Sequence, residues 1–211
     1  MSSERHAGNL ALLGGRLCLD FANTVDGRTG EHPQEWLTSY ADLVAWSEHA
    51  GIVTESEAHH LRDLGARHPT AAWAVLEQAI ALREAIYRIF CATADERPPE
   101  ADDVATLNDA LSEALSRLRV TPTADGFTWQ WAPNKDSLDR MLWPVTRSAA
   151  ELLTSGERSR VRMCAGDDCG WLFFDTSKNR SRRWCSMEDC GNRAKARRHY
   201  LRQRALQEPE R

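Results

Sequence analysis

Four of the six cysteines lie near the end of the chain, in a pattern that could hold a metal ion. Cys164 and Cys169 are separated by four residues, as are Cys185 and Cys190, and 15 residues lie between the two pairs. Two such pairs can place four thiolates around Zn²⁺, which prefers tetrahedral coordination and binds sulfur well. Four thiolates would leave no position for water, so the spacing predicts one structural zinc ion.

Other chemistry uses the same residues. Thiols beside arginines can form a reversible disulfide, four cysteines can hold an iron–sulfur cluster, and cysteines can also occur by chance in a basic tail. Symmetric pairs in a reducing compartment favour zinc. The apolar residues near these cysteines are too few to fold without a metal: Trp171, Leu172, Phe173, Phe174 and Trp184. Cys18 and Cys91 lie in apolar runs, where we expect buried small side chains.

The cysteines lie within a strongly basic segment. Residues 176–205 contain 10 basic and 2 acidic residues, and no helix breaker follows Asn192 until Pro209. Arginine suits paired contacts to phosphate and guanine. The candidate nucleic-acid contacts are Lys178, Arg180, Arg182, Arg183, Arg193, Lys195, Arg197, Arg198 and Arg202. The alternative is a solvated basic face that binds nothing.

Charge and composition set the context for these residues. The net charge is −4, yet residues 161–211 carry 12 basic and 7 acidic side chains, so an acidic body precedes a basic end. That asymmetry predicts an anionic partner, nucleic acid first. The chain has no membrane-length apolar run and no cleavable leader pattern, so we expect a cytoplasmic protein without a membrane partner. It lacks a nucleophile elbow, phosphate loop or dinucleotide fingerprint, so we expect no enzyme.

The elements that must position this region are mainly helical. Helices are predicted after the caps Ser39 and Thr54, over about 70–93, from about 104, and over about 137–154 with a kink at Pro144. Asp125-Gly126 indicates a hairpin turn, after which apolar residues alternate. The run GGRLCLDFANTV could begin either a strand or a buried helix. We therefore predict a mainly α fold with a small β element: a helical domain over 1–156, and over 160–206 a small zinc-ribbon-like finger ending in a basic helix.

Polar residues interrupt the apolar run near the N-terminus. They form either a buried hydrogen-bond network or a pocket for a small-molecule effector. The candidate pocket residues are Arg16, Asp20, Asn23 and Arg28. A homodimer would also fit a regulator that reads paired half-sites.

Two segments resemble known families. CAGDDCGWLFFDTSKNRSRRWCSMEDCGNRAKARRHY closely resembles the CGNR zinc finger, whose name matches residues 190–193. GGRLCLDFANTV, followed by Leu43-x-x-Trp46, resembles the ABATE domain, which precedes this finger in bacterial proteins regarded as stress-induced transcription regulators. The resemblance covers nearly the whole chain. It implies zinc and DNA binding, but no particular DNA target.

Within the finger, each residue that follows the last cysteine has a hypothetical role. Gly191 allows a tight turn past the metal or a positive φ, and Asn192 caps the following helix. Arg193 either pairs with Asp175 and braces the finger or contacts phosphate. The alternatives to a DNA-binding regulator are an RNA-binding protein, with Trp171, Phe173 and Tyr200 stacking on bases, and a ligand-binding or protein-interaction module with purely structural zinc.

Overall fold

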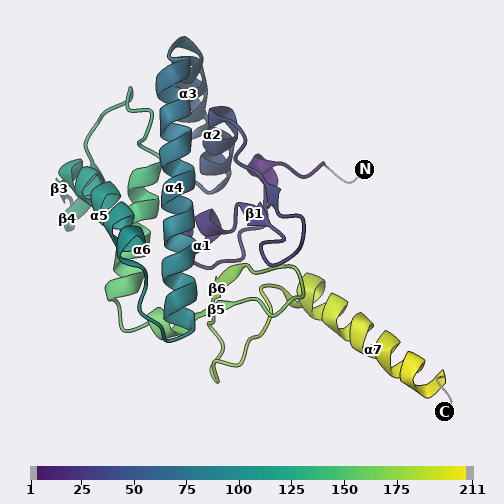
Figure 1. Cartoon of the computed structure of the whole chain (residues 1–211). Helices are drawn as coiled ribbons and strands as arrows, with labels where there is room; N and C mark the ends of the chain where they lie inside the picture. The colour runs from purple at the N-terminus through teal and green to yellow at the C-terminus, as the bar shows by residue number, and fades with distance from the viewer. Residues whose placement is uncertain (1–3, 208–211) are drawn as a thin grey trace.

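The computed structural model describes residues 4–207, with side chains up to residue 204, and is mainly helical (Figure 1). The helices are α1 (Leu17–Ala22), α2 (Tyr40–His49), α3 (Glu55–Arg67), α4 (Pro69–Ala94), α5 (Ala101–Ser116), α6 (Leu142–Thr154) and α7 (Asn192–Gln207). Three two-stranded antiparallel sheets join β1 (Val25–Asp26) to β2 (Gln34–Glu35), β3 (Leu118–Thr123) to β4 (Gly126–Trp131), and β5 (Val161–Met163) to β6 (Leu172–Phe174). This confirms the predicted fold class, and the apolar run near the N-terminus is a helix. No helix in the described part of the chain is long and apolar enough to cross a membrane.

Local sequence signals set the helix starts. The Ser39 hydroxyl accepts the N–H of Asp42 at the start of α2, and Thr54 and Glu57 form a reciprocal capping box on α3. Pro69 occupies the first turn of α4, where its missing N–H is not needed. The short helix Ala7–Asn9 is capped in the same reciprocal way by His6.

The predicted kink at Pro144 is wrong. Helix α6 begins at Leu142 instead of near residue 137, so Pro144 lies in the first helical turn. The backbone N–H groups of that turn have no intrahelical acceptor, and proline therefore breaks no hydrogen bond there. A turn over residues 138–141 takes the place of the expected first helical turns.

The long helix α4 lies at the centre of the body, with the other helices around it (Figure 1). Fully buried apolar side chains from α1, α2 and α4 form the core, and the rings of Phe21 and Trp46 pack 5.1 Å apart. Burial of such side chains gives the body its main stabilisation.

The finger shares this core. Val161 of β5 and both Leu172 and Phe174 of β6 belong to the same buried cluster as the helices. Strand alternation turns the intervening Phe173 to the opposite side, where it joins Trp171 and the cysteines. The short sheet β5–β6 therefore belongs to both the metal-site cluster and the helical core.

Candidate metal centre and basic helix

Two turns bring the four cysteines together. The loop between β5 and β6 carries Cys164 and Cys169, and a five-residue π-helical turn, Met187–Gly191, carries Cys190, with Cys185 just before it. A short hairpin encloses the first pair, because Met163 pairs with Leu172 across the loop.

The four sulfur atoms have the geometry of a tetrahedral zinc site. All four Sγ atoms lie within 4.8 Å of one another, and Cys185 Sγ is 3.7 Å from both Cys169 Sγ and Cys190 Sγ. A tetrahedron with Zn–S bonds of about 2.3 Å has S–S edges of about 3.8 Å. The residues present thus fit one zinc ion held by Cys164, Cys169, Cys185 and Cys190. Three of these side chains are buried and Cys169 is half-buried.

Crowding of the thiols supports a cation at this place. Hydrogen bonds from the Cys169 and Cys185 thiols lower the pKa of Cys164. The same contacts to Cys164 raise the pKa values of Cys169 and Cys185, since a second thiolate would lie beside the first. Four thiolates would therefore need a metal ion to neutralise their mutual repulsion.

Hydrogen bonds from neighbouring groups orient two of the sulfurs. The backbone N–H of Cys185 donates to Cys164 Sγ at 3.3 Å, and Arg193 Nη2 donates to Cys190 Sγ at 3.2 Å. Arg193 Nε also lies 3.2 Å from Asp189 Oδ1. The predicted pairing of Arg193 with Asp175 is wrong, and the guanidinium instead braces the last ligand from the first turn of α7.

Of the two roles expected for Gly191, the tight turn fits the structure and the positive φ does not, and the role of Asn192 changes. Gly191 is buried in the turn that carries Cys190, where a Cβ would lie 2.9 Å from Met187 Sδ. Asn192 has helical dihedral angles, and its Nδ2 donates to the Glu188 carbonyl instead of capping α7. The cap comes earlier, from Ser186, because the π turn continues directly into the helix.

Asp175 organises the loop between β6 and the second cysteine pair. It is fully buried, and its carboxylate accepts the backbone N–H groups of Ser177 at 2.8 Å and Arg182 at 3.0 Å. Burial alone would raise the pKa of Asp175, but these hydrogen bonds hold it below its ordinary value. Arg182 stacks on Phe173 and donates to the carbonyls of Trp184 and Cys185. Arg182, one of the candidate nucleic-acid contacts, is thus engaged in holding this loop.

Helix α7 projects away from the body (Figure 1). Two of its cations are tied back to the finger: Arg193 to Asp189, and Arg197 to Asp167. The opposite face carries Lys195, Arg198 and Arg202, all exposed and without an ion pair among the described residues. At 3.6 residues per turn these three form one stripe. The structure thus divides the predicted helix cations into two sets.

A second basic surface lies on the other part of the finger. A hollow of about 310 Å³ is lined by Met163, Ala165 and Ser181 together with four arginines: Arg162, Arg180, Arg182 and Arg183. Lys178 is exposed on the same loop. Arg162 is not among the contacts predicted from the sequence, although its alternation with Val161 in β5 could have placed it on the exposed side of the strand.

The candidate pocket residues all make contacts inside the protein. Asp20 accepts the Gly14 N–H, Asn23 bonds the backbone of Leu172, Arg28 pairs with Glu84, and Arg16 lies over the ring of Phe174. A cavity of about 330 Å³ lies instead between the N-terminal segment and the finger, and is lined by Arg5, Asp26, Asp168, Trp171, Cys169 and Arg193 among others. The polar residues near the N-terminus were predicted to form either a buried hydrogen-bond network or a pocket for a small-molecule effector. Their contacts in the structure are those of a hydrogen-bond network.

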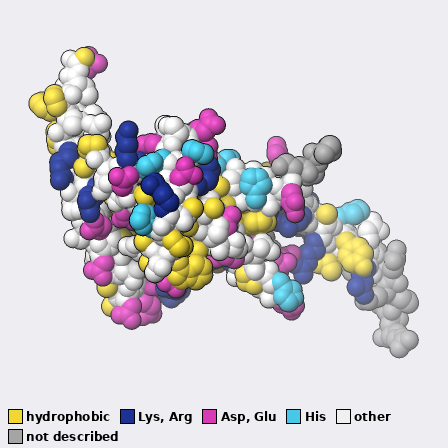
Figure 2. All heavy atoms as spheres, turned by 90° about the horizontal axis from the view of Figure 1, so that it is seen from above, with side chains coloured by type: hydrophobic (Ala, Val, Ile, Leu, Met, Phe, Trp, Pro, Cys, Tyr) yellow, Lys and Arg dark blue, Asp and Glu magenta, His cyan; other side chains and the backbone are white. Residues whose placement is uncertain are grey.

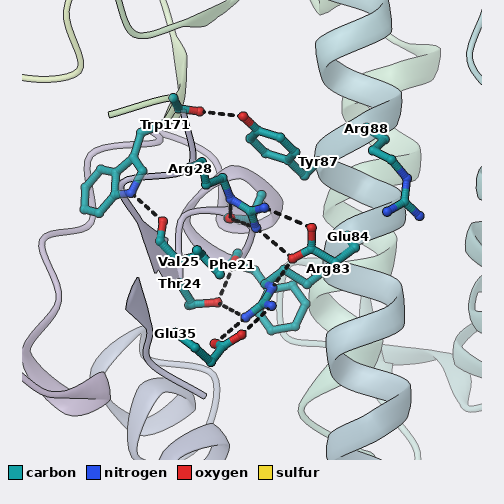
Figure 3. A network of polar contacts seen from close by, with 12 residues as sticks. Phe21, Thr24, Val25, Arg28, Glu35, Arg83, Glu84, Tyr87, Arg88 and Trp171 are labelled. Atoms are coloured by element: carbon teal, nitrogen blue, oxygen red, sulfur yellow. Dashed lines mark hydrogen bonds and ion pairs between the residues drawn. The ribbon is translucent and has the colours of Figure 1, made fainter. Parts of the chain in front are cut away.

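That network fixes the finger to the body (Figure 3). Arg28 is almost fully buried, pairs with Glu84 at 2.9 Å and lies over the ring of Tyr87, whose hydroxyl donates to the Gly170 carbonyl at 3.0 Å. The same Glu84 contacts Arg83, which in turn pairs with Glu35 at 2.6 Å. Burial works against the charge on Glu84, but the two arginines hold its pKa below its ordinary value.

Four more hydrogen bonds near the first cysteine pair extend this anchoring. The backbone N–H of Arg28 donates to the Cys169 carbonyl, and the Trp171 indole N–H donates to the Val25 carbonyl at 2.9 Å. Asn23 donates to the Leu172 carbonyl at 2.8 Å and accepts its N–H at 2.9 Å. The side-chain amide of Asn23 thus bonds both backbone groups of Leu172, as the backbone of a neighbouring strand would. The sequence singled out Asn23 but could not identify its partner.

The fold and the four-thiol cluster together define a zinc-finger protein whose finger is built into a helical body. The family model for ABATE, described as "Putative stress-induced transcription regulator", matches residues 15–156, and the model for the CGNR zinc finger matches residues 160–203. The chain therefore belongs to the ABATE family and carries a CGNR zinc finger. This confirms the resemblance seen in the sequence. A search of curated proteins finds no match.

Proposed function

We propose that this protein binds duplex DNA as a transcriptional regulator, with the exposed stripe of α7 as its reading surface. The observation that carries the proposal is the division of the helix cations. Arg193 and Arg197 face acidic partners in the finger, whereas Lys195, Arg198 and Arg202 have no ion pair within the part of the chain that the structure describes and lie on the other face of a helix that projects from the body. A single exposed helix of this kind can enter the major groove.

Zinc supplies rigidity in this proposal. It would hold the two cysteine turns together, and Arg193 would transmit that order to the first turn of α7. The arginine-lined hollow around Arg162 offers a second surface for backbone phosphates. Contacts of this kind add affinity without reading sequence.

The RNA alternative is less well supported. Trp171 and Phe173, two of the three aromatic side chains expected to stack on bases, are buried; only Tyr200 is exposed, at 60%. Unpaired bases need accessible aromatic faces. The geometry therefore favours duplex DNA.

Fluorescence anisotropy with a mixed-sequence DNA duplex over a salt series tests the proposal. The triple variant Lys195→Ala, Arg198→Ala and Arg202→Ala should weaken binding, and the slope of log K against log salt should fall by about 0.9 for each lost phosphate contact. The control removes the same charge from the exposed body residues Arg67, Arg97 and Arg119 and should bind like the wild type.

Zinc content measured on each variant separates loss of contacts from loss of fold. Unchanged DNA affinity in the triple variant with one zinc retained would refute the reading surface. Tighter binding of single-stranded RNA than of duplex DNA at equal salt would favour the RNA alternative instead.

A further inference from the structure

The hairpin β3–β4 has one wholly apolar face. In the observed register Leu118 faces Trp131, Val120 faces Trp129 and Pro122 faces Phe127, and these six side chains share one side. The other side carries the polar residues Arg119, Thr121, Thr123, Thr128 and Gln130, together with Gly126. The apolar face meets the body at its base, where the ring centroids of Trp131 and Trp143 lie 5.9 Å apart, and at Trp129, whose ring faces Arg147 of α6.

The outer half of this face is open to solvent. Phe127 is 78% exposed, and Val120 and Trp129 are each 56% exposed. Figure 2 shows hydrophobic side chains on this projecting hairpin, at the upper left. Leu115 of α5, 49% exposed, continues the surface onto the helices. Large aromatic side chains rarely stay this exposed without a partner.

A groove lies directly beside the apolar face. It measures about 310 Å³ and runs between the hairpin and helices α5 and α6, lined by Leu111, Leu115, Leu118, Trp129, Arg147, Ala150, Glu151 and Thr154. Hairpin and helices together make an apolar corner. Because an apolar hairpin projects beside an apolar groove, the hairpin of one molecule can cover the groove of a second, identical molecule.

We propose that this corner is a homodimer interface, in which the hairpins of two copies pack apolar face to apolar face about a two-fold axis. Each hairpin tip then lies over the groove of the other copy, because the same patch serves both copies in an isologous contact. Sheets packed in this way lie about 10 Å apart, with their inward side chains interdigitated.

The exposed area suits such a dimer. From their exposed fractions, Leu115, Val120, Phe127 and Trp129 offer roughly 450 Å² of apolar surface per copy. A standard interface buries about 800 Å² per partner, of which a little over half is apolar. The patch therefore supplies about the apolar area that a stable dimer needs, and the surrounding polar residues would form its rim.

The turn and the groove carry charged side chains as well. Asp125 lies exposed in the hairpin turn, and Arg147 lines the groove, 5.7 Å from the Trp129 ring centroid, where it pairs with Glu151 of the same helix at 2.6 Å. When the tip of one copy covers the groove of the other, Asp125 approaches Arg147 of the second copy. The hairpin and α7 lie on opposite sides of the molecule (Figure 1), so the dimer leaves both basic helices free.

Sedimentation equilibrium of the full-length protein over a concentration series tests this interface without any DNA. The wild type should be a dimer. Phe127→Asp should raise the dissociation constant of the dimer about a thousandfold. Loss of a hot-spot residue costs about 30-fold, and a symmetric dimer loses this residue in both copies. Thr128→Asp, which adds the same charge one residue away on the polar face, should remain a dimer.

Charge reversal gives an independent arm of the test. Asp125→Arg and Arg147→Glu should each weaken the dimer, and their combination should restore it toward the wild-type dissociation constant. A monomeric wild type at every concentration would overturn the proposal and leave the corner to another partner. A dimer that withstands Phe127→Asp would overturn it by placing the contact elsewhere.

Discussion

Replacement of Asn23 by alanine should weaken the attachment of the finger to the body, and it should lower the free energy of unfolding more than the replacement of an exposed residue. Asn23 is only 2% exposed, and its side-chain amide makes two hydrogen bonds with the backbone of Leu172. The alanine variant leaves the N–H and C=O of a fully buried residue unpaired. Each such group costs about 1–3 kcal/mol, so the two groups predict a loss of about 2–6 kcal/mol from the free energy of unfolding.

That loss is a large share of the 5–15 kcal/mol that stabilises a typical domain. In a chain of this length each kcal/mol lowers Tm by about 2–4 °C, so thermal unfolding followed by circular dichroism should show a decrease of about 4–24 °C. Zinc should also be lost faster to a chelator, because Leu172 follows Cys169 by three positions. Asn108→Ala, on the exposed side of α5, is the control. If Asn23→Ala lies within about 1 kcal/mol of the wild type, the pairing of Asn23 with β6 does not stabilise the finger.

Two further predictions concern titration and metal binding. Burial, only partly offset by the hydrogen bond from Gly14, raises the pKa of Asp20 to about 6, so its ionisation destabilises the folded state as the pH rises from about 4 to 6. Asp20→Asn should therefore increase the free energy of unfolding at pH 8 by up to about 3 kcal/mol, which thermal unfolding would show as a higher Tm. An equal gain at pH 3.5, where Asp20 is largely protonated in both states, would show that the gain does not come from the ionisation of Asp20. Cys185→Ser should abolish the single equivalent of zinc measured by elemental analysis, whereas serine at Cys91, outside the cluster, should leave it in place.

Several features could be read from the sequence because they depend on residues close together in the chain. The cap at Ser39 and the capping box at Thr54 are local signals that occur where they were predicted. The hairpin turn lies one residue earlier than predicted, at Ala124-Asp125, because Gly126 already pairs with Thr123. The cysteine spacing is local too within each pair. Two short turns and a returning strand suffice to gather the four thiols, so the metal centre follows from the order of residues alone.

Other features depended on which distant segments meet. Arg193, Arg197, Lys195 and Arg198 look alike in the sequence, and among the described residues only the first two have a carboxylate partner, Asp189 and Asp167. Asp189 lies four residues before Arg193, at helical spacing. Asp167 lies 30 residues before Arg197, and it reaches the helix only because the first cysteine turn folds against it, so no helical periodicity could identify it in advance.

The body and the finger illustrate the same division. The sequence determined that the chain has a helical part and a four-cysteine part, since helix periodicity and ligand spacing are written in consecutive residues. Only the tertiary structure decided that the two share one core, through Leu172 and Phe174 on one face of β6 and Phe173 on the other. It also showed that Arg28 and Asn23 serve as anchors for the finger. A buried polar side chain needs a partner, and that partner can come from any part of the folded chain.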